Sequence, residues 1–258
     1  MPLRRLVPSI VSILALLTLP LALRAQTDEI QVYDASIAPQ GVVNLTLHNN
    51  FTPDGLKTPA FPGAIVSNHS WNGGAEWAYG AKDWLELGLY LPIFSVVSNR
   101  GAKINGTKLR LLFVSPHARQ RKFFYGMNFE FSYNASWWDP RRYTSEIRPI
   151  VGVHLGRWDL IYNPIFDNSY LHGLAGLDFA PCGRVAYNFS SRWTVATEEY
   201  DDYGTLRAWR PAAKQFHQLW GVVDFNSQLV NIETGIGFGL NSASDPVTLK
   251  LMFSRDLN

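Results

Sequence analysis

The side chains in this sequence that could do chemistry are carboxylates, basic groups and histidines, and many of them alternate with apolar residues. Between residues 123 and 134, for example, Asn128 and Glu130 alternate with Phe129 and Phe131. In a β-strand this spacing places the polar side chains on one face and the apolar side chains on the other. Eleven titratable side chains share the polar faces of such stretches: Glu76, Glu86, Arg110, Glu130, Glu146, Arg148, His154, Asp159, Asp224, Glu233 and Lys250.

One short hairpin predicts which of these side chains meet. The Gly-Arg pair at 156–157 is typical of a two-residue hairpin loop. Such a loop places His154 opposite Asp159 on the polar face. It also places Leu155 opposite Trp158 on the apolar face.

Two further pairs follow from other connections. Folding the strand around Glu130 onto the strand around Arg148, about a centre near residue 139, places these two charges opposite each other. A three-residue turn at 80–82 likewise places Glu76 opposite Glu86. Two facing carboxylates repel unless a cation or a shared proton lies between them, so this pair is a candidate site. Opposite charges that pair either hold neighbouring strands together or form a polar constriction that selects solutes.

Nucleophilic catalysis would need a serine or cysteine beside a histidine base. A serine precedes a histidine by two positions, and so shares its strand face, at Ser67 and His69 and at Ser115 and His117. Both pairs lie in or beside predicted loops and turns. The single cysteine, Cys182, excludes an internal disulfide and is interpreted as an ordinary small residue. We therefore predict no catalytic residue, no metal site and no cofactor.

Strands must position these side chains, because a helix would spread the apolar residues all round its circumference. Each stretch is near the length of about 9 to 11 residues that a tilted membrane strand requires. Twelve strands are predicted, at 41–52, 70–79, 84–95, 108–115, 123–134, 145–155, 158–165, 174–189, 193–200, 216–225, 229–240 and 246–254. Short turns alternate with longer loops, which are expected at 53–69, 96–107, 135–144, 166–173 and 201–215, with a shorter one at 241–245.

Aromatic residues mark the ends of these strands. The chain holds 9 Trp, 11 Tyr and 15 Phe in 258 residues, yet its mean hydropathy is only −0.07. The aromatic residues gather beside the short turns, as at Trp84, Phe123 and Trp158, and near the long loops, as at Trp138 and Tyr143. A soluble β-sandwich would explain the alternation equally well. Two aromatic belts instead favour a barrel that meets lipid headgroups on both sides.

The first 25 residues are predicted to be a signal peptide. Arg4 and Arg5 precede an apolar run that Pro8 and Pro20 interrupt, and Ala25 offers a small residue for cleavage. A membrane anchor helix is the alternative, which the prolines disfavour. Removing residues 1–25 leaves one more acidic than basic residue, so no nucleic-acid partner is expected. Residues 26–40 then form a segment in the periplasm or inside the barrel, and residues 41–258 form the barrel.

Several segments carry a resemblance to a known family. These are Leu47–Asn50, Tyr79–Gly80, Trp84–Tyr90, Arg148–Ile150, Gly156–Trp158, Asn163–Pro164, Gly176–Phe179, Glu199–Tyr200, Gly235–Leu240 and Asp245–Lys250. They resemble the outer-membrane β-barrels described as similar to the protein of the meta-pathway of phenol degradation. The resemblance spans nearly the whole chain after residue 40, and its motifs describe strand and turn composition more than a reactive site. It implies a barrel through which small molecules, such as aromatic or hydrophobic ones, cross the outer membrane.

The sequence thus predicts an all-β fold: a closed antiparallel transmembrane β-barrel of about twelve strands, with short periplasmic turns and longer extracellular loops. We expect a channel or passive transporter in the bacterial outer membrane, with a narrow lumen. A lipid-modifying outer-membrane enzyme and a non-conducting structural barrel are the alternatives. The expected partners are outer-membrane lipid, the barrel-assembly machinery and a small permeant that the sequence does not identify.

Overall fold

The alternating stretches form the strands of one antiparallel sheet. The computed structural model describes residues 29–98, 100–170 and 173–258, and in these ranges the sheet has sixteen strands. The strands are β1 Val43–Asp54, β2 Ser70–Lys82, β3 Leu85–Val97, β4 Gly101–Val114, β5 Phe123–Asn134, β6 Tyr143–Leu155, β7 Trp158–Asn163, β8 Phe166–Asn168, β9 Asp178–Phe179, β10 Cys182–Asn188, β11 Trp193–Asp202, β12 Gly204–Thr205, β13 Ala208–Trp209, β14 Phe216–Phe225, β15 Asn231–Gly239 and β16 Val247–Asp256. Short 3-10 turns occupy Ala118–Gln120, Gly173–Gly176 and Ala212–Lys214. Within the described ranges, no helix is long and apolar enough to cross a membrane.

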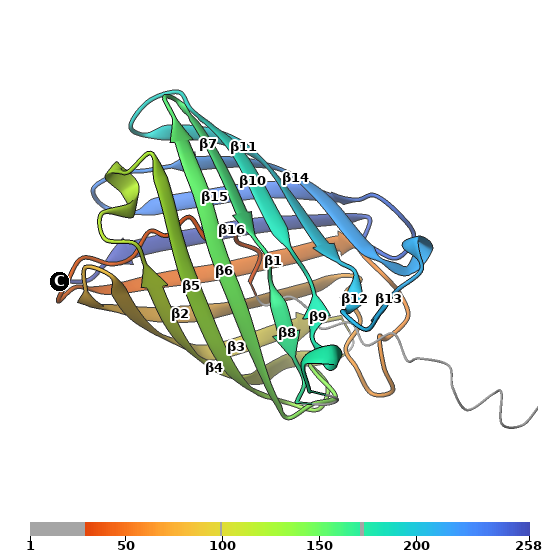
Figure 1. Cartoon of the computed structure of the whole chain (residues 1–258). Helices are drawn as coiled ribbons and strands as arrows, with labels where there is room; N and C mark the ends of the chain where they lie inside the picture. Colours follow the sequence, from red (N-terminus) through yellow and green to blue (C-terminus); the bar gives the residue numbers. More distant parts are fainter. Residues whose placement is uncertain (1–28, 99, 171–172) are drawn as a thin grey trace, which may run out of the picture.

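The sheet closes into a barrel. β1 pairs antiparallel with β16, and β6 pairs with β7, so the ends of the sheet meet. The wall has twelve strands when β8 is counted with β7, β9 is counted with β10, and the two-residue strands β12 and β13 are left out (Figure 1). The short strands β8, β9 and β12 extend this wall at one end by pairing with β6 and with one another. The predicted fold class is confirmed.

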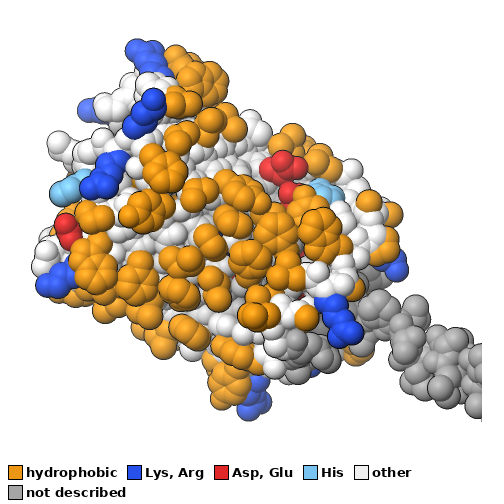
Figure 2. All heavy atoms as spheres, in the orientation of Figure 1, with side chains coloured by type: hydrophobic (Ala, Val, Ile, Leu, Met, Phe, Trp, Pro, Cys, Tyr) orange, Lys and Arg blue, Asp and Glu red, His pale blue; other side chains and the backbone are white. Residues whose placement is uncertain are grey.

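The two faces of the wall differ in polarity. Along β5, Phe123, Tyr125 and Phe131 are exposed on the outer face, whereas Phe124 and Glu130 are buried on the inner face. On the face of the barrel shown in Figure 2, hydrophobic side chains cover the outer surface between the two ends. A closed barrel with such an apolar band is stable in a lipid bilayer, which satisfies the criteria for an outer-membrane β-barrel.

Most of the short connections lie at one end of the barrel and most of the long connections at the other. The β2–β3 and β6–β7 turns have two residues each, whereas the β1–β2 connection covers residues 55–69. The loop expected at 96–107 is wrong. Residues 101–106 belong to β4 and continue its pairing with the end of β3. Pairing with a neighbouring strand therefore outweighs their polar composition.

Trp138 does not lie in an aromatic belt. It is buried against Ile65 and Val97, because the β1–β2 connection folds over this end of the barrel. The backbone N–H of Ile65 donates to the carbonyl of Trp137 at 3.1 Å. The long loops thus cover part of the interior.

The described part of the N-terminal segment, residues 29–40, lies inside the barrel (Figure 1). Ile30 is buried against Trp220 of β14, and Val32 belongs to a buried cluster with Phe124 and Ile150 of β5 and β6. The interior therefore has its own hydrophobic core, built between this segment and the wall. The predicted signal peptide, residues 1–25, lies outside the described residues.

Candidate functional site

Tyr33 attaches the N-terminal segment to the inner face of the wall. Its backbone N–H donates to Asn163 Oδ1 at 2.7 Å, and its carbonyl accepts from Asn163 Nδ2 at 3.0 Å. Its hydroxyl lies 3.0 Å from the hydroxyl of Tyr90 and donates to Glu130 at 3.3 Å. The guanidinium of Arg148 lies 4.3 Å from the centre of its ring, a favourable cation–π position. Residues of β3, β5 and β6 thus hold the Tyr33 side chain, and a residue of β7 holds its backbone.

Glu29 adds a carboxylate from the same segment. It lies 3.9 Å from Lys108 Nζ and 3.8 Å from Arg148 Nη1, and it accepts the hydroxyl of Tyr90 at 3.0 Å. Burial raises the pKa of Glu29, and the neighbouring carboxylate of Glu130 raises it further. The two cations oppose this effect.

Arg110 of β4 binds two of the carboxylates that the sequence singled out. Its Nη2 lies 2.6 Å from Glu76 Oε1 and 2.5 Å from Glu86 Oε1. Glu76 Oε2 also lies 3.0 Å from His48 Nε2. Glu86 accepts the backbone N–H of Ala38 at 2.5 Å. One guanidinium therefore separates two carboxylates and links the wall to the N-terminal segment.

The register predicted for these two carboxylates is wrong. Glu76 lies opposite Tyr90, and Glu86 lies opposite Gly80. The turn occupies residues 83–84 instead of 80–82, and the pairing shifts between Gly80 and Lys82. The two carboxylates meet through Arg110 and not as a directly facing pair.

The predicted pairing of Glu130 with Arg148 is also wrong. Glu130 lies opposite Glu146, two residues away from Arg148. The connection 135–142 is too long to fix a register, and a shift of two residues leaves every side chain on its own face. The facing carboxylates are compensated, because Lys108 Nζ lies 2.9 Å from Glu130 and Arg148 Nε lies 2.7 Å from Glu146.

The hairpin prediction at 156–157 is confirmed. His154 lies opposite Asp159, and Leu155 lies opposite Trp158. His154 Nδ1 is 2.6 Å from Asp159 Oδ1. The two-residue turn fixes the register of its own hairpin, so local sequence was sufficient here.

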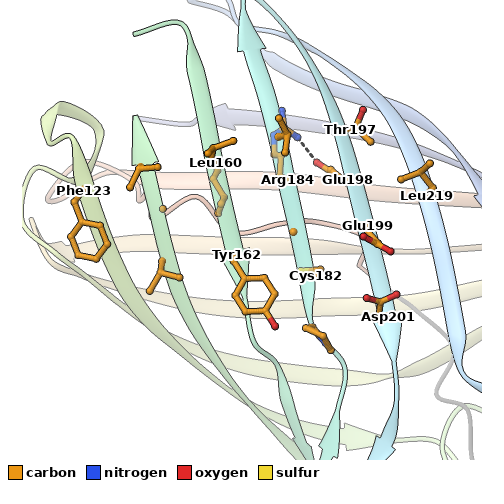
Figure 3. A pocket seen from close by; sticks show the side chains of 17 residues that line it. Phe123, Leu160, Tyr162, Cys182, Arg184, Thr197, Glu198, Glu199, Asp201 and Leu219 are labelled. Carbon is orange, nitrogen blue, oxygen red and sulfur yellow. Dashed lines mark hydrogen bonds and ion pairs between the residues drawn. The ribbon is translucent and has the colours of Figure 1, made fainter. Parts of the chain in front are cut away.

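A second group of charges lies on the strands that follow β7. Arg184 of β10 forms ion pairs with Glu198 of β11 and Asp224 of β14, and the first of these is drawn in Figure 3. Lys250 Nζ of β16 lies 2.5 Å from Glu198 and 2.6 Å from Glu233. β14 and β15 separate β11 from β16 in the sheet, so Lys250 and Glu198 meet through the interior of the barrel.

Sequence reasoning missed several members of this site. Lys108 lies two residues before Arg110 on β4 and therefore shares its face of the strand. Arg184 lies opposite Glu198 across the short turn after β10. The alternation and the turn could have identified these residues. By contrast, nothing local marks Glu29 as a lumen residue, because the segment that carries it shows no strand pattern.

The charges of the interior are unequal in number. Eight carboxylates, Glu29, Glu76, Glu86, Glu130, Glu146, Glu198, Asp224 and Glu233, form ion pairs with five basic side chains, Lys108, Arg110, Arg148, Arg184 and Lys250. The interior described by these contacts is therefore acidic. An acidic lumen concentrates cations and disfavours anions.

The two serine–histidine pairs do not form a catalytic arrangement. Ser67 Oγ donates to Asp245 and lies 3.4 Å from the carbonyl oxygen of Leu56, while Ser115 Oγ accepts the N–H of Tyr125. Within the described ranges, no group of three or more His, Cys, Asp or Glu side chains could hold a metal ion.

Comparisons with known proteins place the fold. No family model and no curated protein matches the sequence. The COG4313 outer membrane channel from Pseudomonas putida F1 matches with a TM-score of 0.58 and 12% identity, over 89% of this chain and 100% of that one. The chain has an outer-membrane β-barrel fold. At this identity the likeness shows the fold alone, and the phenol-degradation family is not shown.

Two further matches have lower TM-scores. The translocator domain of autotransporter NalP from Neisseria meningitidis has a TM-score of 0.43 and 9% identity, covering 85% of this chain and 90% of that one. LpxR from Salmonella typhimurium has a TM-score of 0.41 and 8% identity, covering 82% of this chain and 99% of that one.

Proposed function

We propose that this protein is an outer-membrane channel for the passive transport of small molecules, and that residues 29–40 restrict its lumen. The main support for the proposal is that residues 29–40, which are not part of the wall, fill part of the closed barrel. Residues 29–40 contain no strand, and their contacts with the wall are made largely by side chains. The segment can therefore leave its position without breaking the wall.

The contacts of this segment run across the lumen. Tyr33 is attached to Asn163 of β7, while the carbonyl of Ile30 accepts from Lys250 Nζ of β16 at 3.3 Å. A solute crossing the barrel would have to displace or pass this segment. The Pseudomonas putida protein of similar fold is described as an outer membrane channel, which supports the proposal.

The lining suggests which solutes would pass. The acidic interior favours cations and neutral molecules over anions. Leu112, Phe124 and Ile150 form an apolar surface against Val32 of the segment. This surface supports the narrower class of small solutes with an aromatic or hydrophobic part, which the sequence resemblance also implies.

A reversible disulfide between the segment and the wall tests the proposal. Asn163 bonds both the N–H and the carbonyl of Tyr33, so the cross-link is placed between these two neighbouring positions. We expect the variant Tyr33→Cys, Asn163→Cys, Cys182→Ala to show low conductance in planar bilayers when oxidised. Reduction should raise the conductance severalfold, because the anchoring tyrosine is absent.

Cys182→Ala alone is the control and should not respond to the reducing agent. A folded, heat-modifiable variant that conducts neither ions nor small solutes in either redox state would identify a non-conducting structural barrel. Lipid hydrolysis by the same preparation would support the enzyme alternative instead.

A further inference from the structure

A basic pocket lies at the end of the barrel that carries the short turns. The cavity has a volume of about 580 Å³ and is lined by Arg119, Gln120, Arg121, Lys122, His154, Leu155 and Gly156. The β4–β5 connection supplies the first four of these residues, and the β6–β7 hairpin supplies the others. Lys and Arg side chains lie along this end of the molecule next to the hydrophobic band, at the left of Figure 2.

The cations of this pocket lack carboxylate partners. Arg119, Arg121 and Lys122 are exposed, and in the part of the chain that the structure describes none of them forms an ion pair. Arg119 Nε instead donates to Ser36 Oγ at 2.9 Å. The carboxylate beside His154, that of Asp159, already bonds His154 Nδ1 at 2.6 Å and Asn188 Nδ2 at 2.7 Å. The pocket therefore suits an anion.

One more polar atom is available at the pocket. His154 Nε2 is inaccessible to solvent and has no hydrogen-bond partner among the described residues. Its other ring nitrogen is held by Asp159, so the ring is fixed in orientation.

A lipid-facing groove adjoins the pocket. It has a volume of about 550 Å³, and Phe123, Val153, Leu160 and Val185 are among the residues that line it (Figure 3). The carboxylates of Glu199 and Asp201 line its other end, on β11, away from the basic pocket. Gly183 also lines it and leaves it unobstructed by a side chain of its own. Lys122 of the pocket directly precedes Phe123 of the groove, and Val153 directly precedes His154. The linings of the two cavities thus contain neighbouring residues at the start of β5 and near the end of β6.

We propose that the basic pocket and the adjoining groove together bind one anionic phospholipid of the periplasmic leaflet. Its phosphodiester lies among Arg119, Arg121 and Lys122, and one of its acyl chains lies in the groove. Basic side chains next to a membrane attract anionic headgroups in this way. Phe123 is 55% exposed and Trp158 is 50% exposed, as expected of aromatic residues at the headgroup level. The apolar continuation of the pocket favours a lipid over a free phosphate ion.

Native mass spectrometry of the full mature chain, refolded in non-ionic detergent, tests the site. We expect palmitoyl-oleoyl phosphatidylglycerol to bind at least tenfold more tightly than the zwitterionic phosphatidylcholine with the same chains. Arg121→Gln with Lys122→Gln should weaken phosphatidylglycerol binding at least fivefold and leave phosphatidylcholine binding unchanged. The control, Lys57→Gln with Arg207→Gln, removes the same charge from exposed loop positions and should change neither.

The groove is tested separately, so that the result does not depend on the charge variants. Gly183→Leu places a side chain in the groove, where a Cβ atom meets no heavy atom closer than 3.5 Å. It should weaken phosphatidylglycerol binding at least threefold. Gly221→Leu, where a Cβ atom meets nothing within 4 Å, is the control and should leave binding unchanged.

Heat-modifiable electrophoretic mobility verifies that each variant is folded. Equal affinity for the two lipids, or unchanged phosphatidylglycerol binding in the Arg121 and Lys122 variant, would overturn the site. Inorganic phosphate that binds as tightly as phosphatidylglycerol would overturn the assignment to a lipid. Unchanged binding in Gly183→Leu would overturn the placement of the acyl chain.

Discussion

Glycines on the inner face of the wall make room for large buried side chains. Gly237 lies opposite Trp220, and a Cβ atom at Gly237 would lie 2.1 Å from the indole ring. Gly152 lies opposite Phe124 with the same spacing of 2.1 Å to that ring. The aromatic rings occupy the space that a side chain at Gly237 or Gly152 would need. The interior at these positions is therefore closely packed.

Gly237→Val should therefore destabilise the barrel. A methyl-bearing side chain would push Trp220 out of its place, and such overpacking costs about 1 to 3 kcal/mol. The change is measurable as a lower urea midpoint for unfolding in lipid vesicles, followed by electrophoretic mobility.

Gly221→Val is the matched control on the neighbouring strand. A Cβ atom at Gly221 meets nothing within 4 Å, so this valine should leave the urea midpoint unchanged or raise it slightly. Equal midpoints for the Gly237 and Gly221 variants would show that the indole ring moves without cost.

At the scale of elements, the N-terminal segment is the part of the interior whose position is not fixed by strand pairing. Its carboxyl group at Glu29 has a raised pKa, because burial opposes ionisation more than Lys108 and Arg148 favour it. The carboxyl group of Glu29 thus holds its proton more tightly when the segment is docked. In a released segment, Glu29 would have the ordinary pKa of about 4.3. By linkage, docking weakens as pH rises from that value through the raised pKa.

Conductance in planar bilayers should accordingly increase with pH over this interval. In Glu29→Gln no proton is exchanged at this position, so the conductance should be lower than that of the wild type at neutral pH and less dependent on pH. Glu199→Gln, which alters an exposed carboxylate, should behave as the wild type. An identical pH profile in Glu29→Gln would rule out this residue as the source of the dependence.

At the scale of the whole molecule, the ion pairs leave three more carboxylates than basic side chains in the interior. Closure of the barrel concentrates these charges in one volume, where they act on any solute that enters. A small permeant therefore meets an acidic field along with an apolar surface.

This field predicts cation selectivity. In a potassium chloride gradient the reversal potential of the channel should indicate that potassium is more permeant than chloride. Glu146→Gln with Glu233→Gln should reduce the permeability ratio at least twofold, because both carboxylates are only partly buried and lie in the interior network. Glu199→Gln should leave the ratio unchanged, and anion selectivity of the unmodified protein would contradict the prediction.

The sequence by itself determined most of the strands, their two faces and the hairpin at 156–157. The strand predicted at 174–189 is wrong, because a 3-10 turn at Gly173–Gly176 and the break between β9 and β10 interrupt it. Alternation is a property of neighbouring residues, and a two-residue turn fixes the register of the strands it joins. The same local information explains why the outer-membrane barrel and its twelve strands could be predicted, and why His154 was correctly placed opposite Asp159.

Only the tertiary structure decided which charges meet. The register of Glu130 depends on a connection too long to fix it, and a shift of two residues preserves the alternation, so no local pattern distinguishes the alternatives. Lys250 reaches Glu198 only because the sheet closes and curves. The position of Glu29 inside the barrel likewise depends on contacts with residues distant in sequence, which exist only once the wall surrounds it.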